Sequence, residues 1–531
     1  MTQRAGGQAS RHEDPAPPPG KDDAARVAGR GFVMITGAKV VFMVMGTAVT
    51  IGMPLLGLTP EQFGDYNTII AAVSLLNMVV ITGTLQAVAK LVSETPAAAG
   101  DIVRRAALLQ LCFGVPVAGA YVLCAPLIAG AFSDPSLTPL LRVSGLITLA
   151  YSFYAVFVGY FNGRKLFGKQ AALDATFSTT KTVLMLGLVI AGYGVAGAVW
   201  GFAAAASIIV FVAAALFGLS RSREATSERS DAGGRLVGYL LTIMFYTFCI
   251  YGVLRADLFI VRALTAAGVS TEAGALMAGI YGGIQYMARL PFQAVIAVTF
   301  VVFPLISAAT FNADVEATRG YIRGTLRYSL ILTVLLSAVV AGNASELVAG
   351  MYGADYGAGV LALQVLTVAT VGYSLFYIAT TMITGAGQPA LSAAVAFATL
   401  LVTGAANYLA VDAAVAAGAS VETIMVTGAV ATAASMLLGF GLAVGVLLWK
   451  YRAGLPWATL ARVTLAGTVV AVLCSIAQTP VATSRLLQLL AAVGKGGVAA
   501  ALFVGMLFAM RELGSDDLAR VRRVVGRKGK K

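Results

Sequence analysis

Charged residues are scarce in this chain, and histidine and cysteine are scarcer still. Asp, Glu, Lys and Arg make up only 11% of the 531 residues, whereas a soluble globular domain carries about 25%. No polar stretch exceeds about thirty residues, which leaves no room for a sizeable water-soluble domain. The single histidine, His12, lies in a polar N-terminal stretch, and all four cysteines lie within apolar runs. We therefore expect no disulfide framework, metal site or resident cofactor.

Apolar residues dominate what remains: they make up 59% of the chain, and the mean hydropathy is +0.86. About fourteen apolar segments are each long enough to cross a bilayer as a helix. We place them at residues 32–57, 64–92, 104–131, 137–162, 167–191, 194–219, 236–263, 275–306, 322–350, 357–384, 389–413, 421–449, 457–478 and 485–510. The tightest join is the break at Gly192-Tyr193-Gly194. The sequence predicts an all-α integral membrane protein.

Lysine and arginine set the predicted orientation, because cytoplasmic loops carry an excess of both. With the N-terminus inside, 28 of the 37 basic residues fall in the tails and loops of one side. Both termini are thus expected in the cytoplasm, and the net charge of +13 forms a collar facing anionic lipid rather than a nucleic-acid surface. The basic run at 521–531 either fixes topology or binds acidic lipid. Residues 1–30 are expected to be a disordered tail without a cleaved signal peptide.

Two stretches about 220 residues apart resemble each other. Leu127–Phe132 (LIAGAF) matches Leu347–Tyr352 (LVAGMY), and Tyr151-Ser152 matches Tyr373-Ser374. Span four then corresponds to span ten, which predicts two six-helix lobes related by a parallel repeat. The predicted division is a tail at 1–30, an N-lobe at 31–220, a linker at 221–235, a C-lobe at 236–450, two appended helices at 451–511 and a basic tail at 512–531.

About eight charged residues are expected to be buried within the predicted spans, and six of them are basic. A charge at the centre of a membrane helix costs at least roughly 2.5–3.5 kcal/mol, so it persists only beside a wet cavity or a partner. The basic residues are Lys39, Lys90, Lys181, Arg255, Arg289 and Lys495, against Asp174 and Asp257. A net positive interior predicts the transport of an anionic substrate.

Short motifs in the first hundred residues add a resemblance. Arg30-Gly31, Ala38-Lys39-x-x-Phe42, Leu58–Tyr66 (LTPEQFGDY), Asn77 and Gly83–Ala87 (GTLQA) resemble the Wzx-type polysaccharide flippases of the MOP exporter superfamily. The resemblance implies a MATE-like V-shaped bundle with a cationic cavity and alternating access. It also implies a flippase in the bacterial inner membrane for undecaprenyl-pyrophosphate-linked oligosaccharides of O-antigen, capsule or exopolysaccharide. Membrane lipids and polysaccharide polymerase or assembly proteins are the expected partners.

Three alternatives stay open. Lipid II flippases of the same superfamily also have fourteen spans, but their first two spans carry more cavity arginines. Cation-coupled multidrug exporters commonly use a carboxylate in span one, where this chain has none. A membrane glycan polymerase or ligase is an enzyme and usually needs a large external loop, whereas the longest ones here have about ten residues.

The charged residues divide by expected role. Arg289, Lys39, Arg255 and Lys181 are candidate cations for the pyrophosphate; the alternative is a buried structural ion pair for Arg289 and snorkelling for Lys39. Asp174 and Asp257 could carry a coupling proton or sodium ion, or form structural pairs. Asn77 and Gln86 could bind glycan hydroxyls or other helices. Lys90 and Lys495 are expected to serve topology or packing.

Overall fold

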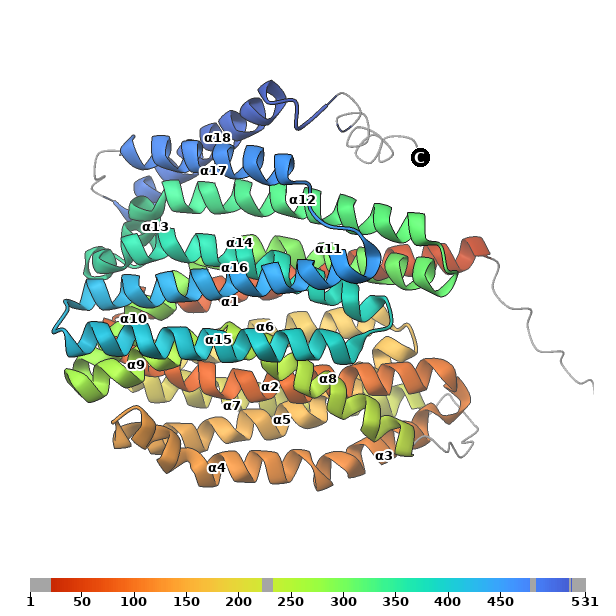
Figure 1. Ribbon diagram of the computed structural model, residues 1–531. Coiled ribbons are helices and arrows are strands. Elements are labelled where there is room, and N and C mark those ends of the chain that lie inside the picture. Colours follow the sequence, from red (N-terminus) through yellow and green to blue (C-terminus); the bar gives the residue numbers. More distant parts are fainter. Residues whose placement is uncertain (1–20, 222–232, 478–483, 515–516, 518–531) are drawn as a thin grey trace, which may run out of the picture.

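The computed structural model describes residues 21–221, 233–477, 484–514 and 517. The first twenty residues, most of the predicted linker and most of the basic tail lie outside these ranges. Within them every regular element is helical (Figure 1). The N-terminal half comprises α1 (Lys21–Leu55), α2 (Pro60–Glu94), α3 (Ala99–Cys112), α4 (Gly114–Ala131), α5 (Thr138–Gly163), α6 (Phe167–Leu188) and α7 (Gly194–Arg221).

The C-terminal half and the two appended helices continue the up-and-down pattern. The half comprises α8 (Gly233–Val253), α9 (Ala256–Gly268), α10 (Thr271–Ala288), α11 (Leu290–Phe311), α12 (Val315–Gly342), α13 (Ala344–Met351), α14 (Val360–Gly385), α15 (Pro389–Ala416) and α16 (Val421–Tyr451). The appended helices are α17 (Trp457–Ile476) and α18 (Arg485–Ala509). Four short helical turns are η1 (Pro96–Ala98), η2 (Pro135–Leu137), η3 (Val189–Tyr193) and η4 (Ala354–Gly359).

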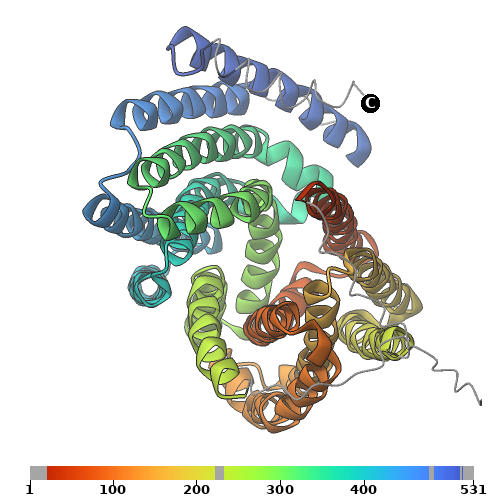
Figure 2. The ribbon, with the colours of Figure 1, turned by 90° about the vertical axis from the view of Figure 1, so that its right-hand side faces the viewer.

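The helices lie roughly antiparallel, so that the bundle has two faces (Figure 1). We call the face where α1 begins and α18 ends the terminal face. The opposite face, which carries the loops at 56–59, 132–134 and 269–270, is the distal face. Viewed along the helices, the two halves form two groups, with α17 and α18 on the outside of the C-terminal half (Figure 2). Helices dominate because every backbone donor and acceptor in a bilayer must be satisfied within the span.

Eleven helices of the described residues are long and apolar enough to cross a membrane, or twelve if the bent pair α8–α9 counts as one span. This count does not confirm the predicted fourteen. One of the eleven runs from Phe167 to Leu219 and so crosses the predicted break. The break is nevertheless present, because Gly192 and Gly194 have φ values of 91° and 54°. Positive φ is readily adopted by glycine and lets α7 fold back against α6.

Several predicted boundaries need correction. Helix α1 begins at Lys21, so residues 21–30 are helical rather than part of a disordered tail. Four predicted spans are interrupted: span three at Phe113, span seven between Val253 and Ala256, span eight at Arg289 and span nine at Asn343. Apolar content alone predicts the length of a span, but not a break at which the backbone changes direction.

The two helices proposed to correspond in the repeat are alike in form. Both α5 and α14 have 26 residues, each follows a short helical turn, and each ends at a glycine, Gly163 or Gly385. Ser152 and Ser374, matched in the repeat, are both fully buried. The division into two six-helix lobes remains a prediction.

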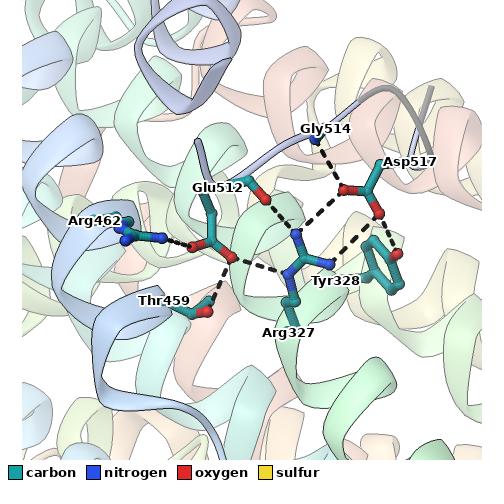
Figure 3. A network of polar contacts seen from close by, with 7 residues as sticks. All are labelled: Arg327, Tyr328, Thr459, Arg462, Glu512, Gly514 and Asp517. Carbon is teal, nitrogen blue, oxygen red and sulfur yellow. Dashed lines mark hydrogen bonds and ion pairs between the residues drawn. The ribbon is translucent and has the colours of Figure 1, made fainter. Parts of the chain in front are cut away.

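The appended helices are fixed to the C-terminal half near both faces. Toward the distal face, Lys495 Nζ of α18 lies 2.7 Å from Glu346 Oε1 of α13, and both side chains are almost buried. At the terminal face, Glu512 accepts hydrogen bonds from Arg327, Thr459 and Arg462 (Figure 3). A separate apolar core joins α12, α14, α17 and α18 between these anchors.

Candidate functional site

Two helix breaks meet inside the C-terminal half. Helices α8 and α9 bend by 54° at residues 254–255, and α10 gives way to α11 at Arg289. The Arg289 guanidinium donates a hydrogen bond from Nη2 to the backbone oxygen of Leu254, at the neighbouring break, and another to Gln285 Oε1 at 2.9 Å. A break leaves backbone groups without helical partners. Arg289 therefore satisfies a carbonyl that the bend in α8–α9 exposes.

Asp257 lies next to this junction and is only 1% exposed. Its Oδ2 accepts hydrogen bonds from Gln285 Nε2 at 2.7 Å, Tyr281 Oη at 3.2 Å and Thr432 Oγ1 at 3.3 Å. Its Oδ1 accepts the backbone N–H of Leu258 at 2.8 Å. These donors explain how a carboxylate persists in an apolar bundle. Asp257 points into its own half of the chain, not toward the other lobe.

Asp257 and Arg289 border one small cavity, of about 20 Å³. Other polar groups on its wall are Gln285, Thr370 and Thr432. This volume suits a single water molecule or an ion, not a sugar or a phosphate. The predicted substrate cation Arg289 thus lies at a compact polar junction within the C-terminal half.

In the N-terminal half, Lys39 and Asp174 come together. Lys39 Nζ of α1 lies 3.2 Å from Asp174 Oδ2 of α6, and the Tyr154 hydroxyl of α5 donates to Asp174 Oδ1 at 3.1 Å. The carboxylate is almost buried, whereas the Lys39 side chain is 58% exposed. Asp174 is therefore paired with a neighbouring helix rather than with Lys181, which lies seven residues along the same chain.

Lys181 lies between aromatic rings. Its Nζ lies 5.0 Å from the ring centre of Phe42 and 5.2 Å from that of Phe202, distances at which a ring face attracts a cation. The ammonium of Lys39 lies 5.8 Å from the same Phe42 ring. The motif Ala38-Lys39-x-x-Phe42 thus supplies one cation, Lys39, and the Phe42 ring that lies near both Lys39 and Lys181. Lys181 has no ion-pair partner within the described residues.

Arg255 lies at the bend of α8–α9 and is half-buried. Its electrostatic neighbours are Arg289, Asp257 and Tyr66, and Tyr66 belongs to α2 of the other half. Over the described ranges its guanidinium makes no hydrogen bond or ion pair. Among the described residues, Arg255 and Lys181 are therefore the two predicted substrate cations whose charged groups make no hydrogen bond or ion pair, whereas Lys39 binds Asp174 and Arg289 binds Leu254 and Gln285.

The two candidate glycan contacts lie on α2. Asn77 is 5% exposed, and its Oδ1 has no hydrogen-bond partner in the described part of the chain. Gln86 is exposed.

As expected, Lys495 pairs with another helix, through Glu346. In the described ranges, no group of three or more His, Cys, Asp or Glu side chains could hold a metal ion.

Sequence reasoning missed one charge cluster. Arg262 lies at the end of the predicted span 236–263 and was not a candidate, yet its side chain is 1% exposed and contacts both Asp65 and Asp134. The signal was its position within the apolar run 258–266, where an arginine must have partners. Its two partners lie about 130 and 200 residues away along the chain, and their proximity could not be read from spacing.

Comparison with known proteins places the chain in a family. The sequence model described as "Polysaccharide biosynthesis protein" matches residues 57–361, which is more than half of the chain. The chain belongs to this family. The predicted Wzx-type resemblance is thereby confirmed, and the match extends far beyond the N-terminal motifs that suggested it.

A curated relative of this polysaccharide biosynthesis protein is the uncharacterized membrane protein YabM of Bacillus subtilis (strain 168). It is 24% identical over 319 residues, which cover 57% of this chain and 60% of the relative. The match thus spans about 60% of the length of that relative.

Solved structures identify the fold. The lipid II flippase MurJ in an inward closed conformation superposes with a TM-score of 0.66 at 14% identity, over 90% of this chain and 99% of MurJ. An inward-facing MATE multidrug transporter of the MOP superfamily superposes with a TM-score of 0.61 at 13% identity, over 77% of this chain and 95% of the transporter. A MOP superfamily transporter from Pyrococcus furiosus superposes with a TM-score of 0.56 at 15% identity, over 80% of this chain and 96% of that transporter. The predicted all-helical MOP fold is confirmed, and the proteins that share it are named as flippases and transporters.

Proposed function

We propose that this member of the polysaccharide biosynthesis family is a flippase for undecaprenyl-pyrophosphate-linked oligosaccharide repeat units. It would move them from the cytoplasmic to the periplasmic leaflet of the bacterial inner membrane, with both termini in the cytoplasm. The observation that carries the proposal is a pair of cations, Lys181 and Arg255, that make no hydrogen bond or ion pair among the described residues, in a chain that the family match assigns to polysaccharide biosynthesis.

The substrate chemistry fits these cations. A pyrophosphate carries two to three negative charges and cannot enter hydrocarbon unpaired, and charge-assisted hydrogen bonds to ammonium or guanidinium groups offset that cost. Lys39 and Lys181 belong to the N-terminal half and Arg255 to the C-terminal half, so a pyrophosphate that passes between the halves would meet cations from both. Asn77 and Gln86 would bind glycan hydroxyls. Arg289 would contribute its charge from behind Arg255.

Asp257 is the better candidate for the coupling cation. Oxygen atoms of Asp257, Thr432 and Asn407 converge from α9, α16 and α15, with Thr432 Oγ1 3.3 Å from the carboxylate and 3.1 Å from Asn407 Oδ1. The single hydroxyl hydrogen of Thr432 cannot be shared fully between two acceptors. A hard cation such as Na⁺, or a proton on Asp257, would relieve that competition. Asp174 already binds Lys39, which makes it less available.

Complementation in two hosts tests the function and separates the alternatives. Expression in a host lacking its polysaccharide flippase should restore surface polysaccharide, whereas expression in a host depleted of its lipid II flippase should not restore growth. The variants Lys181→Gln and Arg255→Gln should each lower the rescue at equal protein level. Arg142→Gln, at an exposed arginine of α5 near the distal face, is the matched control. Rescue only of the lipid II host would overturn the proposed substrate.

A further inference from the structure

A buried cluster of charged side chains surrounds Arg262. Its Nη2 lies 2.7 Å from Asp65 Oδ1 and 3.1 Å from Asp134 Oδ2, and its Nη1 donates to Thr68 Oγ1 at 2.8 Å. The guanidinium also lies 5.6 Å from the ring centre of Phe132. Arg262 is only 1% exposed, and it is the largest fully buried side chain among those the structure describes.

The members of this cluster come from opposite halves of the molecule. Arg262 belongs to α9 in the C-terminal half. Asp65 and Thr68 belong to α2, and Asp134 to the loop between α4 and η2, all in the N-terminal half. Every member lies near the distal face. The ion pairs therefore bind one half to the other, whereas Lys495–Glu346 and Arg327–Glu512 bind helices on the C-terminal side of the chain to each other.

The same interface contains a very close crossing of two helices, one from each half. A methyl group added to Gly64 of α2 would overlap the backbone oxygen of Ala275, and one added to Gly279 of α10 would overlap that of Pro60. The two helices therefore meet backbone to backbone, as small residues allow in membrane bundles. Beside them, Thr271 Oγ1 donates to the backbone oxygen of Ser133 at 3.1 Å.

The cluster is tightly packed but not fully satisfied. Arg262 Nε and the nearby Asn67 Nδ2 are buried without a hydrogen-bond partner among the described residues. The attraction within a buried ion pair offsets little more than the free energy that its charges lose on leaving water. Its net contribution to holding the two halves together is therefore close to zero. Water at an opened face would rehydrate the three charges. Such a contact can close and open at small net cost, whereas an equally large apolar contact strongly favours closure.

We propose that Arg262, with Asp65 and Asp134, is the latch that holds the distal face closed during the transport cycle. The glycine crossing of α2 and α10 sets how closely the halves approach, and the ion pairs fix that contact. Release of Arg262 separates the distal ends of the halves and opens the periplasmic exit. The proposal rests on the proposed function only in requiring that the halves move apart at this face. It holds for any substrate.

The distance between the halves is the direct test. We would label cysteines placed at exposed Ala131 of α4 and Ala416 of α15, in the full-length protein with Cys112 and Cys124 replaced by serine. Spin-label distances in lipid nanodiscs then report the separation of the distal ends. In Arg262→Gln the population with separated ends should rise roughly tenfold, which corresponds to ~1.4 kcal/mol. Gly279→Ala should separate them by steric contact.

A second variant addresses the possibility that Arg262→Gln does not fold. Arg262→Met combined with Asp65→Asn and Asp134→Asn leaves no unpaired buried charge. Because the uncharged contact gains no hydration of charges on opening, this variant should shift the population the other way, toward closed ends. Lys495→Gln is the control, since it breaks a comparably buried ion pair near the same face within one side of the molecule. It should lower thermal stability without changing the distance. An unchanged distance distribution in the folded Arg262 variants, or an equal change in the control, would overturn the latch. Neither readout depends on the glycolipid.

Discussion

Lys39 Nζ lies 3.2 Å from Asp174 Oδ2, so the cation of α1 is bound to the carboxylate of α6. The contact is asymmetric, because Asp174 is almost buried and also accepts the Tyr154 hydroxyl, whereas Lys39 is 58% exposed. An ion pair that is open to its surroundings on one side contributes at most about 1 kcal/mol. Lys39 is thus held in place by a contact that an incoming anion could replace.

Neutralising Asp174 should strengthen anion binding rather than weaken it. In Asp174→Asn the Lys39 ammonium loses its internal counter-ion, so we expect undecaprenyl pyrophosphate to bind several-fold more tightly. Lys39→Gln should bind it several-fold more weakly, with thermal stability changed by less than about 1 kcal/mol. Binding to purified protein in nanodiscs would measure both. Equal weakening by both substitutions would mean that the pair only joins α1 to α6.

Arg289 should prove necessary for the fold of the C-terminal half. Arg289→Gln removes the donor to the Leu254 carbonyl and leaves buried groups unsatisfied, which costs about 1–3 kcal/mol. We expect a lower unfolding temperature in detergent. Arg289→Lys keeps the charge, but its ammonium does not reproduce the planar guanidinium whose Nη2 bonds both Leu254 and Gln285, so it should recover only part of the loss. Full stability together with lost transport would instead make Arg289 a direct ligand of the substrate.

The sequence predicted the fold well because its signals are local. Apolar length predicts membrane helices, and the glycines at 192 and 194 mark a reversal that the backbone of α6 and α7 adopts. The orientation of side chains within a span was less accessible. Arg255 and Asp257 are two residues apart, and only the structure shows that Asp257, just after the bend at 254–255, points into its own half.

The candidate site was only partly predictable for a related reason. Lone charges in apolar runs can be recognised from composition, so Lys39, Lys181, Arg255 and Arg289 all stood out. Their partners depend on which helices pack together. Arg262 pairs with carboxylates from α2 and a distant loop, and Lys495 with one on α13. Whether a cation is available to a substrate depends on such long-range pairing, which a single sequence does not contain.

Sodium or protons should stabilise the protein through Asp257. A ligand that binds only the folded state raises stability by about 2.7 kcal/mol at one hundred times its dissociation constant. We therefore expect the unfolding temperature to rise when Na⁺ replaces choline, or when the pH is lowered modestly. Both Asp257→Asn and Thr432→Val should reduce the response. The first replaces the carboxylate, and the second removes the hydroxyl that lies between Asp257 and Asn407.

Asp174→Asn serves as the control for this ion effect, since it neutralises the other candidate coupling carboxylate. It should keep the response to the coupling cation. If parent and Asp257→Asn respond alike, or if neither Na⁺ nor pH has an effect, Asp257 is structural. The four donors around its carboxylate would then account for its presence.

The contact of Asp517 with α12 should weaken in acid. The Tyr328 hydroxyl donates to Oδ1 at 2.6 Å, the Gly514 amide to Oδ2 at 3.1 Å, and Arg327 lies 3.3 Å from Oδ2 (Figure 3). The hydrogen bond from the Tyr328 hydroxyl is the largest effect, and with the other two groups it stabilises the ionised carboxylate. Together they outweigh the cost of partial burial and lower the pKa of Asp517. A carboxyl whose pKa is lower in the folded protein adds stability above its unfolded pKa, near 3.9. That stability is lost as the pH falls through the lowered value.

The matched comparison is therefore between the parent and Asp517→Asn at two pH values. The parent should unfold at a higher temperature than Asp517→Asn at pH 7, and the difference should disappear well below pH 4. Glu512→Gln, which changes the neighbouring carboxylate bound by Arg327, Thr459 and Arg462, should be destabilising at pH 7 in its own right. Spectroscopic thermal unfolding in detergent measures all three proteins. A difference between parent and Asp517→Asn that persists unchanged in acid would show that the ionised carboxylate does not hold this segment against α12.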